Sequence, residues 1–132
     1  MQVGETSKAE MIERTDPLTG RRIIQLTAAN AVDHPLYYYV RTITADNRYL
    51  IFHRLQNGEL QYHRLDLETG EIVCLTAAQS PGCMWRQWMF SEARGVREFL
   101  GVLNAVTNEL VYLDGETFRA VHVETLQDRV VA

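Results

Sequence analysis

The sequence predicts an all-β fold: a partial β-propeller of about two four-stranded antiparallel blades with an extra N-terminal strand. The first observation is a repeat, because DPLTGRRIIQLTAA (16–29) returns as DLETGEIVCLTAA (66–78) and, more weakly, as VETLQDRVVA (123–132). A period of roughly 50 residues is typical of repeat architectures. The second observation is that residues 37–76 contain four strand-like runs in consecutive hairpins, which is the size of one propeller blade.

The N-terminal part divides into an arm and a strand. Residues 1–15 are polar and mixed in charge, so we expect a flexible arm that nothing anchors. Residues 16–36 are predicted to form the N-terminal strand and a loop. Thr19-Gly20 supplies a tight turn, because glycine accepts positive φ without steric cost, and the β-branched run at 21–26 follows it as the strand.

Residues 37–78 form the predicted first blade. Aromatic and β-branched residues dominate its strand-like runs, as is typical of strands on a half-buried sheet. These runs are YYYVRTIT (37–44), YLIFHR (49–54), LQYHRLDL (60–67) and IVCL (72–75). Asn57-Gly58, between the second and third runs, is the strongest short hairpin signal in the chain.

The remainder of the chain holds an insertion and a less regular second blade. The inserted segment at 79–96 is apolar, and its tryptophans have the spacing of a short amphipathic helix; a long extended segment is the alternative. Residues 97–132 form the predicted second blade. Its strand-like runs lie at 99–106, 109–113, 118–123 and 129–131.

Composition and charge exclude several classes of protein. The 132 residues include 13 basic and 17 acidic side chains, a net charge of −4, without a basic stripe, so we expect no nucleic-acid partner. No apolar run reaches the roughly 20 residues that a membrane helix needs, so no membrane partner is expected. The polar N-terminus does not resemble a secretory signal. We therefore expect a cytoplasmic, reducing environment in which Cys74 and Cys83 are free thiols, although the two could pair.

The histidines show no metal-ligand spacing. His53, His63 and His122 lie inside predicted strands, and the sequence contains no H-x-H, H-x-x-x-H or C-x-x-C pattern. His53 and His63 could instead lie opposite each other across the Asn57-Gly58 hairpin. The sequence also has no serine-hydrolase elbow, phosphate-binding loop or dinucleotide fingerprint. We therefore predict no catalytic residue, no metal ligand and no cofactor site in this chain.

Four features occur in order between residues 16 and 76. They are a D-x-x-T-G-x-x-x-x-x-L-T run from Asp16, His34 followed by Tyr37-Tyr38-Tyr39, the segment ITADNRYLIF (43–52), and an N-G…L-D-L-E-T-G run that ends at Gly70. Together they resemble the N-terminal region of oligogalacturonate lyases and, more broadly, WD-like and periplasmic-type propeller repeats. The resemblance implies a seven-bladed propeller that cleaves oligogalacturonates by β-elimination with a divalent metal such as manganese. It also implies that the metal-binding histidines and the catalytic base belong to later blades, so this chain alone is expected to be inactive.

Four residues are candidate contacts for an acidic sugar. His34 precedes the predicted inner strand, and Tyr37, Tyr39 and Arg41 share one face of that strand by alternation. Tyrosine rings offer flat apolar faces to sugars, and a guanidinium binds a carboxylate through two parallel hydrogen bonds. The alternatives are a packed loop histidine, blade-to-blade packing of the tyrosines, and a solvated or salt-bridged arginine.

The predicted blades are too few to close a ring. A closed propeller needs at least four blades, on the order of 160 residues. We therefore expect the remaining blades of a longer chain or a homo-oligomer as partner. The predicted function is the N-terminal propeller portion of an oligogalacturonate-lyase-like protein of pectin degradation. The alternative is a non-catalytic binding or assembly module, which an exposed apolar surface at 79–96 would favour.

Overall fold

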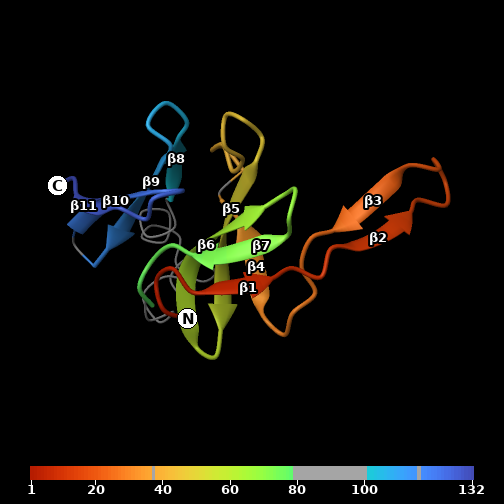
Figure 1. Ribbon diagram of the computed structural model, residues 1–132, viewed down its shortest axis with the longest axis horizontal. Helices are drawn as coiled ribbons and strands as arrows, with labels where there is room; N and C mark the ends of the chain where they lie inside the picture. The colour runs from red at the N-terminus through yellow and green to blue at the C-terminus, as the bar shows by residue number, and fades with distance from the viewer. Residues whose placement is uncertain (37, 79–100, 116) are drawn as a thin grey trace, which may run out of the picture.

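The described part of the chain consists of β-strands in three antiparallel sheets (Figure 1). The computed structural model describes residues 1–36, 38–78, 101–115 and 117–132, and these residues contain no helix. The strands are β1 (Thr6–Lys8), β2 (Ile12–Thr15), β3 (Arg22–Gln25), β4 (Val32–Pro35), β5 (Tyr49–Gln56), β6 (Glu59–Asp66), β7 (Glu71–Cys74), β8 (Val102–Asn104), β9 (Glu109–Asp114), β10 (Thr117–His122) and β11 (Asp128–Val130). The predicted all-β class is confirmed.

Two of the sheets are consecutive meanders, which we call blade 1 and blade 2. Blade 1 has the strand order β1-β7-β6-β5-β4, and blade 2 has the order β11-β10-β9-β8. The third sheet contains only β2 and β3, and we call it the hairpin. This arrangement agrees with the predicted partial propeller. The predicted insertion at 79–96 lies outside the described residues.

One type of turn recurs in the chain and explains the sequence repeat. At Asp66, the carboxylate accepts hydrogen bonds from the backbone N–H groups of Glu68 and Thr69, both at 2.9 Å. Gly70 closes the turn by donating its N–H to the Asp66 carbonyl, and its φ of 75° carries no steric penalty for glycine. Corresponding turns occur at 16–20, 104–108 and 122–126.

The turns of blade 2 have the same geometry with different residues. Asn104 and His122 accept the backbone hydrogen bonds in place of aspartate. Asn108 and Leu126 adopt positive φ, 56° and 62°, in place of glycine. The weak third copy in the sequence is therefore a structural repeat, and the turn at 104–108 is a further copy. Sequence comparison did not find that copy, which has Asn104 and Asn108 in place of the aspartate and the glycine.

The N-terminal segment 1–15 differs from the predicted flexible arm. β1 pairs with β7 as a fifth strand of blade 1, and β2 pairs with β3. Gly4 N–H also donates to the Cys74 carbonyl, and Ala9 N–H donates to the Gly70 carbonyl. The prediction was wrong because a polar strand satisfies the backbone groups of a sheet edge as well as an apolar strand does. Composition therefore gave no sign of this pairing.

The inner strand of blade 1 is split, which corrects the predicted continuous strand at 37–44. β4 pairs with the second half of β5, and Ile43 bridges Leu50 in the first half of β5. Leu36 and residues 38–41 lie between these two pieces and form no strand. The side chain of Leu36 is buried at the start of the loop. Packing of this one leucine, together with the strand β4 before it, overrides the β-propensity of the tyrosines.

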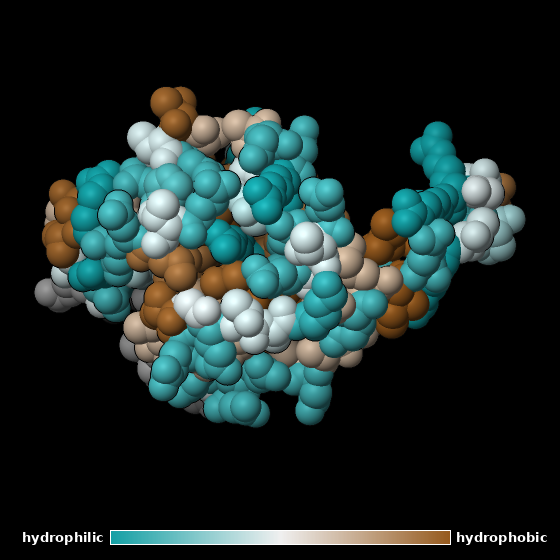
Figure 2. Space-filling model, viewed as in Figure 1, coloured by the Kyte–Doolittle hydropathy of each residue, from teal (hydrophilic) through white to brown (hydrophobic). Residues whose placement is uncertain are grey.

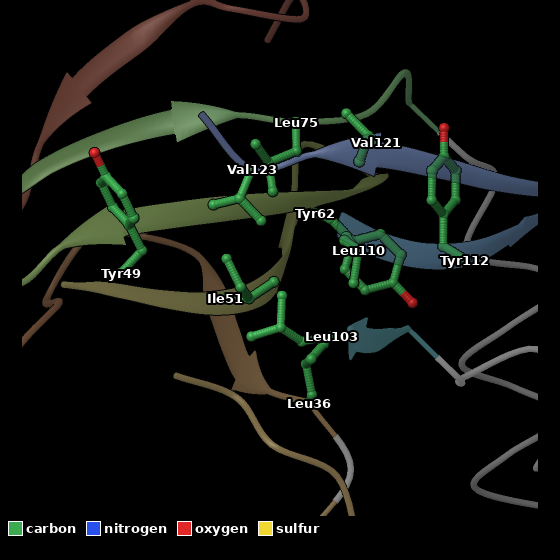
Figure 3. Packing of buried hydrophobic residues seen from close by; sticks show 10 residues of the cluster. All are labelled: Leu36, Tyr49, Ile51, Tyr62, Leu75, Leu103, Leu110, Tyr112, Val121 and Val123. Atoms are coloured by element: carbon green, nitrogen blue, oxygen red, sulfur yellow. The ribbon is translucent and has the colours of Figure 1, made fainter. Parts of the chain in front are cut away.

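The main core lies between the two blades (Figure 3). It contains buried aromatic and aliphatic side chains from both sheets: Leu36, Tyr49, Ile51, Tyr62, Leu75, Leu103, Leu110, Tyr112, Val121 and Val123. Figure 3 shows Leu36 close to Leu103, which places the inner edges of the two blades at the same side of the core. A polar bond adds to this packing, because the Arg64 guanidinium donates to the backbone carbonyl of Val123.

Blade 1 is also covered on its other face. Phe52, Leu65 and Ile72 are buried there, and Met11 and Leu26 at the base of the hairpin pack against them. The two strands of the hairpin project away from the sheets, as Figures 1 and 2 show. Blade 1 is therefore the middle layer, with blade 2 on one face and the base of the hairpin on the other.

Candidate functional site

The candidate site lies at the inner edge of blade 1, where the edge strand is divided into two pieces, β4 and residues 42–44. We call Leu36 and residues 38–41 the inner-edge loop. On either side of this loop, β4 and residues 42–44 both pair with β5. Irregularities of this kind at sheet edges are over-represented beside active sites, because they re-aim side chains.

His34 lies within β4, with its side chain exposed at this edge. Its ring stacks on His53 of β5 at a centroid separation of 5.7 Å, and His53 meets the ring of Tyr62 edge-on at 5.9 Å. Tyr62 in turn lies 5.8 Å from Tyr112 of blade 2. A row of rings therefore runs from the exposed edge into the core. Burial, and secondarily repulsion from His34, lowers the pKa of His53 to about 4, so His53 is neutral at pH 7.

Tyr39 and Arg41 lie in the inner-edge loop. The Tyr39 ring is exposed and lies 4.0 Å from the ring of Tyr38. Arg41 donates from Nε to the Ile43 carbonyl at 2.7 Å and from Nη2 to the Thr44 carbonyl at 3.3 Å. These bonds use two of the five N–H groups of a guanidinium. The Arg41 head group is therefore fixed against its own loop, and its donors that are not bonded to Ile43 or Thr44 can face a ligand.

Tyr37, the remaining predicted contact, lies outside the described residues. The predicted alternation of Tyr37, Tyr39 and Arg41 along one strand face does not hold, because residues 38–41 are not a strand. The structure instead places exposed His34, Tyr39 and Arg41 along a single edge of blade 1, one from β4 and two from the loop that follows it.

The face of β4 and β5 opposite His34 carries an ion pair that the sequence reasoning missed. Arg54 donates from Nε and Nη2 to the two carboxylate oxygens of Asp33, each at 2.7 Å, and both side chains are largely buried. Burial would raise the pKa of Asp33, but hydrogen bonds from Arg54 and Thr27 outweigh this effect and lower the pKa. The pair fastens β4 to β5 directly behind His34.

His63 is buried on the same face as this ion pair. Its Nδ1 lies 3.2 Å from the Gln61 carbonyl, which can only accept, so Nδ1 carries the hydrogen. Burial, followed by the charge of Arg54, lowers the pKa of His63 to about 4. The β5–β6 register puts His53 and His63 on opposite faces of the sheet, which corrects the prediction that they lie opposite each other.

The side chains at the inner edge are suited to contact a ligand through ring stacking, hydrogen bonds and charge. An exposed aromatic ring, an imidazole and a fixed guanidinium suit a ligand that combines flat apolar faces with carboxylates.

Within the described residues, no three His, Cys, Asp or Glu side chains gather as a metal site would require. Across these residues, no helix has the length and hydropathy to span a membrane. Cys74 is buried and burial raises the pKa of its thiol, whereas Cys83 lies outside the described residues.

Comparison with known proteins shows structural similarity to oligogalacturonate lyases. The chain matches an oligogalacturonate lyase from Vibrio parahaemolyticus with a TM-score of 0.75 and 22% identity. It matches an oligogalacturonate lyase in complex with manganese with a TM-score of 0.72 and 26% identity. Each match covers 98% of this chain but only 31% of the solved protein. No family model and no curated protein matches the sequence. The resemblance predicted from the sequence is confirmed, together with the propeller-type fold.

Proposed function

We propose that this chain is the N-terminal propeller portion of an oligogalacturonate-lyase-like protein of pectin degradation, and that its inner edge contacts an acidic oligosaccharide. The observation that carries the proposal is the similarity of nearly the whole chain to two such lyases, of which it covers 31%. One of those lyases binds manganese. The described residues of this chain do not fit a metal, so we assign them substrate contacts and assign β-elimination to the rest of the propeller.

Each contact has a distinct chemical role in this proposal. The exposed ring of Tyr39 stacks on a sugar face, and the Arg41 donors that are not bonded to Ile43 or Thr44 bind a uronate carboxylate. His34 donates to a hydroxyl or carboxylate from the neighbouring position on β4. Behind His34, the Asp33–Arg54 pair keeps the strand in place, so the edge is organised before the ligand arrives.

A second candidate function is a non-catalytic assembly module. Strand edges in blade 2 and in the hairpin that pair with no strand among the described residues favour it, since such edges are templates for pairing with another chain. The two functions are compatible, because the inner edge of blade 1 and these outer edges involve different residues.

The test of the first function is a calorimetric titration of the chain with oligogalacturonate. We expect binding, and we expect Tyr39→Ala and Arg41→Gln each to weaken it by about tenfold, the equivalent of about 1.4 kcal/mol. The control Val106→Ala, a side chain that is 94% exposed in blade 2, should bind as the unaltered chain does. A neutral galactose oligomer of equal length should bind more weakly.

An activity assay separates binding from catalysis. With oligogalacturonate and manganese, the chain alone should produce no ultraviolet absorbance from unsaturated product. Failure to bind oligogalacturonate, or equal binding of the charged and neutral oligomers, would overturn the assignment of the inner edge. Production of unsaturated product would show that the chain supplies catalytic groups of its own.

A further inference from the structure

Two pieces of chain form the inner edge of blade 1, and both reach the same residue of β5. In the β4–β5 register, the residue that follows β4, Leu36, would lie opposite Ile51. Ile51 instead donates its N–H to the carbonyl of Thr42 at 2.7 Å, and Thr42 lies six residues after Leu36. The pairing of the edge with β5 therefore shifts at this point, and the inner-edge loop takes up the extra residues.

The side chain of Thr42 replaces a hydrogen bond that this shift would otherwise break. In a continuous antiparallel strand, the Leu36 N–H would donate directly to the Ile51 carbonyl. Here the Leu36 N–H donates to the Thr42 hydroxyl at 3.3 Å, and this hydroxyl donates to the Ile51 carbonyl at 2.6 Å. A hydroxyl can form both bonds, because it has one donor and two acceptor positions. We call the Thr42 hydroxyl and these two bonds the clasp, since one oxygen atom joins both ends of the loop to β5.

The backbone groups that the clasp connects belong to core residues. Leu36 and Ile51 are both buried between the two blades, where Figure 3 shows them, and Thr42 is half-buried. Buried backbone N–H and C=O groups are almost always hydrogen-bonded, and an unpaired one is costly. Valine has the shape of threonine without the hydroxyl, so at position 42 it would leave one donor and one acceptor without this bond.

The clasp adjoins the guanidinium that is proposed to bind the sugar. Arg41 directly precedes Thr42, and its head group donates to the carbonyls of Ile43 and Thr44, which directly follow Thr42. Ile43 bridges Leu50 of β5. The backbone of Arg41 therefore leaves the sheet on one side of Thr42, while its head group binds on the other side. Where the guanidinium lies depends on how firmly Thr42 is held.

We propose that Thr42 is a positioning residue of the inner edge, whose hydroxyl closes the inner-edge loop and so sets where Arg41 meets an acidic oligosaccharide. This role rests on the proposed function and adds to it a residue that acts through Arg41. A loop that is already ordered loses less conformational entropy when a ligand binds, so loss of the clasp weakens binding although every contact residue remains. All groups of the clasp lie within blade 1, so further blades of a longer chain leave it in place.

Amide hydrogen exchange tests the clasp without any sugar. In Thr42→Val, exchange of the Leu36 N–H should rise at least about tenfold, because its acceptor is gone, and Thr42→Ala should have the same effect. Thr42→Ser keeps the hydroxyl and should stay within about twofold of the unaltered chain.

The matched control is Thr76→Val. The Thr76 hydroxyl is also buried in blade 1, where it accepts from the Tyr62 N–H at 3.0 Å, away from the inner edge. This variant should accelerate exchange at Tyr62 and leave Leu36 unchanged, whereas Thr42→Val should do the reverse. Equal acceleration of both amides in both variants would mean a general loosening of the sheet and would overturn the clasp.

Calorimetric titration of the same variants with oligogalacturonate tests the positioning role. Thr42→Val should weaken binding about tenfold, Thr42→Ser should bind within about twofold of the unaltered chain, and Thr76→Val should bind as the unaltered chain does. The decisive variant adds Thr42→Val to Arg41→Gln. If Thr42 acts through Arg41, the added substitution should weaken binding by less than about threefold, because the two effects are coupled. A full tenfold loss in that background would overturn the positioning role.

The outcomes separate the clasp, its role and the proposed function. Unchanged exchange at Leu36 in Thr42→Val, or failure of Thr42→Ser to restore it, overturns the clasp without reference to any sugar. Faster exchange with unchanged affinity for oligogalacturonate overturns the positioning role and leaves the proposed function intact. If the unaltered chain itself does not bind oligogalacturonate, the proposed function fails and the positioning role fails with it, whereas the exchange data still decide the clasp.

Discussion

Blade 1 and blade 2 are both antiparallel meanders with the same type of turn, and β1 adds a fifth strand to blade 1. Their two faces nevertheless carry different kinds of residue. Blade 1 lies between blade 2 and the base of the hairpin, so side chains on both of its faces are buried. Blade 2 buries one face against blade 1, whereas its opposite face carries the exposed side chains of Val102 and Phe118 beside the buried Ala120. The repeat in the sequence therefore specifies a meander and its turns, whereas burial depends on the neighbour that each copy receives.

The polar and charged side chains of the two blades also differ in how deeply they are buried. Blade 1 buries two neutral histidines, His53 and His63, and an ion pair between Asp33 and Arg54. The ion pairs of blade 2 lie at its surface, where water and salt screen them. Changes that alter protonation or charge should therefore destabilise blade 1 far more than blade 2.

The largest expected effect is acid destabilisation through the histidines of blade 1. In the fold, the pKa of His53 and of His63 is lowered from 6.5 to about 4. Both rings bind a proton more readily in the unfolded chain than in the fold. The stability that the two neutral rings provide is therefore complete above pH 6.5 and is lost as the pH falls toward 4. The loss is about 3 kcal/mol for each histidine, most of it above pH 5. Urea unfolding at pH 7 and pH 5 measures it.

A direct check of the same prediction is a titration of the histidine ring protons by nuclear magnetic resonance. His53 and His63 should stay neutral down to about pH 5, well below the ordinary histidine range. His34→Gln removes an exposed imidazole at the edge of the sheet, so it should leave most of the acid destabilisation in place. Titration of both buried rings near pH 6.5 would show that burial does not hold them neutral.

A smaller effect is expected from breaking the buried ion pair. Asp33→Ala leaves the Arg54 guanidinium, 5% exposed, without its carboxylate partner, and the expected loss in the free energy of unfolding is about 3 kcal/mol. The matched variant in blade 2 is Glu109→Ala, which frees the exposed Arg129 and should change stability little. Equal effects in chemical denaturation would contradict the difference drawn between the two blades.

Much of this fold could be predicted from local sequence. Strands β5 and β6 begin and end within two residues of the predicted runs, because the Asn57-Gly58 turn and the apolar alternation are local signals. β1 was missed because its pairing depends on a distant sheet edge. The inner-edge loop was missed because burial of Leu36, a tertiary contact, outweighs the β-propensity of the sequence that follows it.

The candidate site was predictable only in part for the same reason. His34, Tyr39 and Arg41 could be singled out as residue types that suit an acidic sugar, and the structure exposes all three along one edge. The Asp33–Arg54 pair could not be predicted, because it requires the register between β4 and β5. Register follows from the assembled sheet rather than from either segment alone.

The smallest expected effect concerns the turn that the two blades share. Gly70 has a φ of 75°, so Gly70→Ala should destabilise the chain by about 1 kcal/mol from the backbone, and the added Cβ would also meet Met11 Sδ at 2.8 Å. In blade 2 the same position is Asn108 with a φ of 56°, so Asn108→Gly should stabilise the chain by about 0.5 kcal/mol. Thermal melting measures both. Destabilisation by Gly70→Ala together with stabilisation by Asn108→Gly would show that one turn geometry serves both blades. A loss of stability in Asn108→Gly would instead mean that the asparagine side chain makes a stabilising contact of its own.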